Sequence, residues 1–132
     1  MAIIISWVDE EMTIIRLAFQ GQWSNEEFRS SGLQAVLMVR SVSHLVYVIN
    51  DFSASEVLPL GILWQGRNLG QMRPPNWGGA AVITSDAVLI NLVEVFMGVY
   101  MALRHRQSLF FAKTYEEALE IIARLKRENR VS

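Results

Sequence analysis

The stretch that decides the fold is Leu45-Val46-Tyr47-Val48-Ile49-Asn50-Asp51-Phe52-Ser53-Ala54-Ser55-Glu56-Val57-Leu58-Pro59-Leu60-Gly61. It begins as an unbroken apolar run, which is typical of a strand covered on both faces of a sheet. Polar residues follow from Asn50, and a helical pattern then begins with Pro59 in its first turn. Open α/β sheets bind partners where such strands end. We therefore expect the working surface of the protein at a loop from Asn50 to Leu58.

Composition indicates one globular domain. The 132 residues are 52% hydrophobic and 19% charged, with a net charge of −1 and no cysteine. A chain of this length buries about two-thirds of its unfolded surface, so we expect a single domain over residues 1–132. The balanced charge argues against nucleic-acid binding. The lack of cysteine excludes disulfides and thiolate metal sites, and it suits a cytoplasmic protein.

Two runs near the N-terminus predict a β-hairpin. Ala2–Val8 and Met12–Phe19 are rich in Ile, Val and Thr, and an acidic tip separates them. Ser24 and Glu27 have the spacing of a capping box, which predicts a helix over Asn25–Val39. The residues expected to face the sheet from this helix are Phe28, Leu33, Val36, Leu37 and the stem of Arg40.

Strands and helices alternate in the rest of the chain. The expected elements are a helix over Val57–Met72, a strand over Ala80–Thr84, a helix over Ala87–Leu103, a strand over Leu109–Ala112, and a terminal helix that a Thr114–Glu117 capping box opens. The order β-β-α-β-α-β-α-β-α predicts an α/β domain with a mostly parallel or mixed open sheet of about five strands and about four helices. Trp77 is expected in a Pro- and Gly-rich loop, where it either seals the core or contacts a partner.

Ala87–Leu103 is the most apolar segment. A membrane span is one interpretation, but Glu94 at its centre would cost several kcal/mol in lipid, so we expect no integral membrane span. Apolar residues cover about two-thirds of this helix, which is more than a two-layer domain can bury. We therefore expect the segment to form a homodimer interface or to line a pocket.

The sequence has no pattern typical of catalysis or of a cofactor site. His44 and His105 are isolated, and no metal-binding spacing or G-x-S-x-G motif occurs. The glycines match neither a P-loop nor a dinucleotide-binding motif. We therefore expect a protein that is not an enzyme and that needs no metal or other cofactor.

The order of elements and the opening stretch resemble the STAS domain superfamily, which includes the anti-sigma-factor antagonists and the SpoIIAA-like proteins. In antagonists the central strand leads to an Asp-Leu-Ser-like turn and then to Asp-Ser-Ser-Gly-Leu-Gly, where a serine is phosphorylated. Asp51-Phe52-Ser53 fits the turn, and Glu56–Gly61 occupies the second motif. Val57 and Leu58 stand in place of the serines and cannot accept phosphate. The segment Phe110–Leu119 is also similar to the C-terminal strand and helix start of SpoIIAA-like chains.

This resemblance implies a regulatory or protein-interaction module without the phosphorylatable serine at the helix start. Ser53 and Ser55 remain candidate phosphate acceptors, although a turn role for Ser53 and a helix-capping role for Ser55 also explain them. The predicted partner-binding residues are Asn50, Asp51, Ser53, Ser55, Glu56 and Leu58.

An alternative function follows from the same resemblance. SpoIIAA-like proteins resemble the lipid-binding Sec14 type in general architecture, which implies a binder or carrier of a small apolar or lipid-like ligand. The pocket would be lined by Leu63, Trp64, Phe96 and Met97, with Arg67 or Arg73 at its mouth.

Overall fold

The computed structural model describes residues 2–56, 74–84, 90–91 and 109–131. The described elements are β1 (Ile3–Trp7), β2 (Ile14–Gly21), α1 (Asn25–Arg40), β3 (Val46–Ser55), β4 (Trp77–Ile83), β5 (Leu109–Ala112) and α4 (Tyr115–Val131). The described residues therefore contain two of the four expected helices. Those expected over Val57–Met72 and Ala87–Leu103 lie outside the described residues, except for Ile90 and Asn91, whose backbone is helical.

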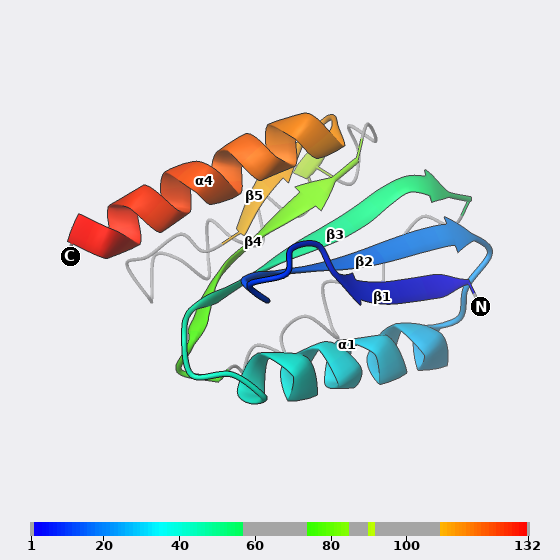
Figure 1. Cartoon of the computed structure of the whole chain (residues 1–132). Coiled ribbons are helices and arrows are strands. Elements are labelled where there is room, and N and C mark those ends of the chain that lie inside the picture. Colours follow the sequence, from blue (N-terminus) through cyan, green and yellow to red (C-terminus); the bar gives the residue numbers. More distant parts are fainter. Residues whose placement is uncertain (1, 57–73, 85–89, 92–108, 132) are drawn as a thin grey trace.

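The strands form one sheet in the order β1-β2-β3-β4-β5. β1 and β2 are antiparallel, and the other neighbouring pairs are parallel. The sheet is therefore mixed and has five strands with β3 at its centre, as the sequence predicts. Figure 1 shows α1 on one face of the sheet and α4 on the other.

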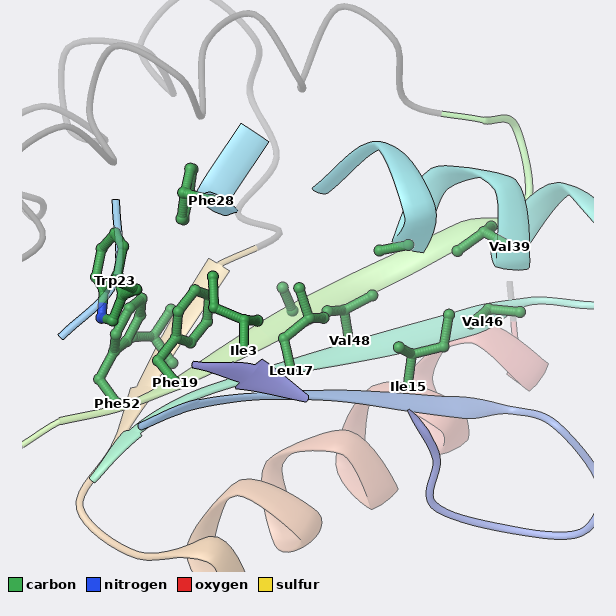
Figure 2. Close-up of a cluster of buried hydrophobic side chains, with 13 residues drawn as sticks. Ile3, Ile15, Leu17, Phe19, Trp23, Phe28, Val39, Val46, Val48 and Phe52 are labelled. Atoms are coloured by element: carbon green, nitrogen blue, oxygen red, sulfur yellow. The ribbon is translucent and has the colours of Figure 1, made fainter. Parts of the chain in front are cut away.

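The core between the sheet and α1 is partly aromatic. Phe19 and Phe52 stack with their ring centres 4.3 Å apart, and Trp23 and Phe28 pack around them. Figure 2 shows these four rings gathered at one end of the cluster, with aliphatic side chains such as Val39 at the other. Aromatic clusters of this kind bury a large apolar area per residue and therefore fix the position of the helix against the sheet.

The buried residues of the core between the sheet and α4 are aliphatic apart from Tyr47. Ala118, Ile122 and Leu125 project from α4 at helical spacing and are buried. The cluster that they join also contains Ile14, Tyr47, Ile49, Ala81, Ile83 and Ala112 from the strands. Leu119 is partly buried against the same cluster.

Both helices begin at the predicted capping residues. The Ser24 hydroxyl accepts a hydrogen bond from the Glu27 amide at 3.1 Å, and the Glu27 carboxylate accepts one from the Ser24 amide at 3.2 Å. At α4 the Thr114 hydroxyl accepts from the Glu117 amide at 3.1 Å, but the Glu117 carboxylate reaches the amide of Lys113 instead of that of Thr114. These bonds satisfy amides that a helix start leaves without partners.

The sheet-facing side of α1 differs from the prediction. Phe28 and Val36 are buried as expected, but Leu33 and Leu37 are exposed, Leu37 by 66%. At about 100° per residue, these two leucines lie roughly 140° and 180° around the helix from Phe28. The stripe that faces the sheet contains Ala35 and Val39 instead, and Arg40 is also exposed.

Asn50–Ser55 is not a loop. β3 continues through all six residues because β2 continues beside it, with Gln20 paired to Ala54 and Gly21 to Ser55. The Glu56 amide then donates to the Gly21 carbonyl at 2.8 Å. The polar residues had suggested a turn, but Asp51 is accommodated inside the sheet by partners described below.

β4 begins three residues earlier than expected, at Trp77. Trp77 is therefore a strand residue, and it packs, partly buried, against the core on the α1 side. This placement favours the core interpretation of Trp77 over a contact with a partner. The preceding Asn76 side-chain amide donates to the carbonyl oxygens of Val39, Val42 and His44.

Candidate functional site

The carboxyl end of β3 projects beyond its neighbour β4. The register of β3 with β4 ends at Asp51 and Ile83, whereas the register with β2 continues to Ser55. Figure 1 shows the arrowheads of β2 and β3 at the same end of the sheet. The last four residues of β3 therefore lie at the carboxyl end of the strands, where parallel sheets present their functional groups.

Asp51 is a buried charged group at this end. It is 3% exposed, and its two carboxylate oxygens accept four hydrogen bonds. One oxygen accepts from Nε and Nη2 of Arg16 at 3.2 and 2.5 Å. The other accepts from the amide and hydroxyl of Ser53 at 3.0 and 2.6 Å. A buried carboxylate is stable when it is paired and hydrogen-bonded in this way.

These contacts determine the charge of Asp51. Burial acts to raise the pKa of this carboxyl, but the hydrogen bonds from Ser53 and Arg16 and the positive charge of Arg16 outweigh burial and lower the pKa below its ordinary value of 3.8. Asp51 is therefore an anion at neutral pH.

Arg16 connects this end of the sheet to α4. Its guanidinium carbon lies 4.9 Å from the centre of the Tyr115 ring in the first turn of α4, a cation–π geometry. The Arg16 side chain is 39% exposed. Arg16 thus joins β2, β3 and α4 while part of its side chain remains exposed.

The two serines of the predicted site both have structural partners. The Ser53 hydroxyl donates to Asp51, and the Ser55 hydroxyl accepts a hydrogen bond from Nε1 of Trp23 at 2.8 Å. Trp23 belongs to the aromatic core, so Ser55 ties the end of β3 to the α1 side of the sheet. The expected helix-capping role of Ser55 involves residues outside the described ranges.

The structure brings together most of the predicted partner-binding residues. Ser53, Ala54 and Glu56 are exposed at the end of β3, Asn50 and Ser55 are partly buried, and Asp51 is buried. We call Ser53, Ala54 and Glu56 the β3-end surface. Leu58 lies outside the described residues. So do all the residues of the alternative ligand pocket, which are Leu63, Trp64, Arg67, Arg73, Phe96 and Met97.

Sequence reasoning did not identify Arg16, Tyr115 or Trp23 as parts of this site. Arg16 carried the clearest signal, because it is the charged residue on a strand face that it shares with Ile14 and Ala18. A charge in such a position requires a partner on the neighbouring strand. The register that selects Asp51 as that partner became visible only in the folded sheet.

The ranges that the structure describes contain no group of three or more His, Cys, Asp or Glu side chains that could hold a metal ion. No helix within them is both long enough and apolar enough to cross a lipid bilayer.

Comparison with known proteins supports the fold. No family model matches the sequence, and no curated protein matches it. One solved structure is similar: the crystal structure of an uncharacterised protein of the DUF3478 family from Shewanella loihica PV-4, which has a SpoIIAA-like fold. The TM-score is 0.58 at 16% sequence identity, and the match covers 90% of each chain. The chain described here therefore has a SpoIIAA-like fold, as its order of elements predicts.

Proposed function

We propose that this protein is a non-enzymatic, STAS-like interaction module that binds a protein partner through the β3-end surface. The fold places this surface at the carboxyl end of a central parallel strand, where proteins with open α/β sheets bind their partners. Ser53 and Glu56 offer polar groups for recognition, and Ala54 between them offers a small apolar contact.

The observation that supports this proposal best is the hydrogen bonding of Asp51. Two of the four hydrogen bonds that the buried Asp51 carboxylate accepts come from Ser53 and hold this exposed residue in place, while the other two come from Arg16 and fix the carboxylate itself. A surface that is already fixed before binding loses less conformational entropy when a partner arrives. The arrangement therefore favours docking onto a rigid edge.

The same geometry makes Asp51 a poor catalytic base. A general base needs a pKa near the working pH and access to the proton that it removes. Asp51 has a lowered pKa, and its oxygens already accept bonds from Arg16 and Ser53. Its chemistry suits a structural role that supports a binding surface.

Site-specific photo-crosslinking in the native cells tests this function. A photoreactive amino acid replaces Ala54 in one strain and Glu10 in another. Both positions are exposed, but Glu10 lies at the hairpin tip, at the opposite end of β2. We expect a discrete adduct with a second protein from position 54 and none from position 10. Glu56→Lys should weaken the adduct at position 54.

Three outcomes would contradict the proposal. Equal adducts from both positions would mean that capture is nonspecific. Adducts from neither position, or adducts that Glu56→Lys leaves unchanged, would mean that the β3-end surface does not bind a protein partner. A crosslink between two copies of this chain would be recognised by its mass and would not count as support.

A further inference from the structure

The outer edge of β1 carries a regular set of backbone groups that point away from the sheet. The Gln20 amide donates to the Ala2 carbonyl, and the Val8 amide donates to the Ile14 carbonyl. Because hydrogen-bonded pairs alternate along an antiparallel ladder, the even-numbered residues of β1 bond to β2. The amides and carbonyls of the odd-numbered residues Ile3, Ile5 and Trp7 therefore point outward.

Within the described residues, this edge lacks the charges and prolines that commonly prevent pairing. β1 reads Ile-Ile-Ile-Ser-Trp and contains neither a charge nor a proline. Ile4 is 48% exposed. In the described part of the chain no strand lies beyond β1, which forms the border of the sheet in Figure 1. Uncharged edge strands are templates for pairing with another strand.

We propose that β1 pairs antiparallel with β1 of a second copy of this chain, with the two-fold axis at Ile5. A second copy of the chain is the expected partner because the outward-facing groups of β1 match those of another β1. With Ile5 opposite its own copy, Ile3 faces Trp7 and Trp7 faces Ile3, so all three outward residues of each strand form hydrogen-bonded pairs. This match closes a two-fold dimer, in which each strand uses the same edge.

The side chains agree with this register. On the α1 side, Ile3 of each copy packs beside Trp7 of the other. On the α4 side, Ile4 lies opposite Ser6, and no like charges meet along Ile3–Trp7. The two sheets join into one continuous sheet. Because β1 and its copy are antiparallel, the two β3-end surfaces point in opposite directions, and both stay accessible to partners.

The proposed dimer is weak. One strand pair of this length buries less than a standard protein interface, so we expect a Kd on the order of 100 µM. This interface is distinct from the Ala87–Leu103 helix, for which dimerisation stays a prediction because that segment lies mostly outside the described residues.

Disulfide trapping tests both the contact and its register. The chain contains no cysteine, so each introduced thiol is unique. In the proposed dimer, residue 4 and residue 6 of the other copy form a non-hydrogen-bonded pair with Cα atoms about 4.5 Å apart. That distance lies within the disulfide range of about 4.4–6.8 Å. The two copies of residue 4, like the two copies of residue 6, are diagonal neighbours about 7–8 Å apart.

We therefore expect an equimolar mixture of Ile4→Cys and Ser6→Cys chains to form disulfide-linked dimers under mild oxidation. Each variant alone should form at least about tenfold less disulfide-linked dimer than the mixture, because its two thiols are too far apart. Both side chains are exposed, so the fold should persist, and circular dichroism checks this. Crosslinking of either variant alone to the same extent as the mixture would overturn the proposed register.

Sedimentation equilibrium of the unmodified chain provides the second test. We expect reversible dimers near the stated Kd and a weakening of about tenfold or more by Ile4→Lys, because a charge on an edge strand opposes pairing. Leu37→Lys is the matched control, since Leu37 is an exposed apolar residue on α1. A strict monomer at about ten times the expected Kd, or equal weakening by both variants, would overturn the proposal.

Discussion

Replacing Asp51 by alanine should destabilise the fold strongly. Asp51 is buried, and the substitution leaves Arg16 without its carboxylate partner. Removal of one member of a buried ion pair costs about 3–5 kcal/mol. Arg16 is 39% exposed and regains hydration, so we expect the low end, about 3 kcal/mol. That is a large part of a total stability that is typically about 5–15 kcal/mol.

A double-mutant cycle isolates the pair. Asp51→Asn keeps the shape of the side chain and removes its charge, and Arg16→Gln removes the charge of the partner with a shorter polar side chain. We expect each single variant to lose about 1.5–3 kcal/mol, with a coupling energy of about 1 kcal/mol or more between them. Urea unfolding, followed by tryptophan fluorescence, provides the free energies. Additive losses within about 0.5 kcal/mol would mean that the ion pair contributes nothing of its own.

The pair also predicts a dependence on pH. The folded pKa of Asp51 is lowered, so its contribution to stability is present above the unfolded pKa of about 3.9 and is lost as the pH falls through the folded value. The difference in unfolding free energy between wild type and Asp51→Asn should therefore shrink between about pH 5 and pH 2. A difference that stays constant across this range would refute the role of the charge.

Three further predictions concern the framework around the site. Gly78→Ala should cost about 1–3 kcal/mol in thermal or urea unfolding, because the new methyl carbon would lie 2.6 Å from a ring atom of buried Tyr47; less than half of that cost should remain in a Tyr47→Leu background. Met12 has a φ of +57° and is 40% exposed. In urea unfolding, Met12→Gly should therefore be as stable as the wild type or more stable by up to about 1 kcal/mol. Met12→Val should be less stable than the wild type by a similar amount. Asp9 has a pKa lowered below 3.8, because hydrogen bonds from Thr13 and Ile14 outweigh the effect of burial. Asp9→Asn should therefore reduce the loss of stability below about pH 4. An acid transition that this substitution leaves unchanged would refute the prediction.

Local sequence patterns predicted the features that depend on neighbouring residues. The bond between Ser24 and Glu27 and the limits of β5 are examples, since each is encoded within a few residues. The mixed sheet followed from the order of elements and from the short connections that such order allows. The capping bond and the limits of β5 need no knowledge of which strands lie side by side.

Features that depend on distant residues were predicted wrongly or missed. Asp51 suggested a turn because an isolated carboxylate is costly inside a sheet. Its partner Arg16 lies 35 residues away along the chain, so the cost could be judged only when the register was known. Leu33 and Leu37 were placed inward for a similar reason. Helix periodicity indicates apolar stripes, but contact with the sheet decides which stripe is buried.

Hydrogen bonds and aromatic contacts also fix α4 at both ends of the sheet. Near the carboxyl end, Tyr115 lies against the guanidinium of Arg16. Near the amino end, Lys126 donates to the Thr13 hydroxyl at 2.8 Å, and Thr13 itself bonds to Asp9. A helix held at two points by side chains from β2 and the hairpin cannot slide along the sheet without losing both contacts.

A rigid α4 limits how partner binding could act on this fold. If a partner at the β3-end surface moved α4, it would have to separate Tyr115 from Arg16, which the Asp51 carboxylate holds in the sheet. Breaking this cation–π contact would cost roughly 0.5–2 kcal/mol of the binding free energy. We therefore expect binding to leave hydrogen exchange in α4 unchanged while protecting the amides of Ser53 and Glu56. Faster exchange along α4 on binding would instead identify α4 as a moving element.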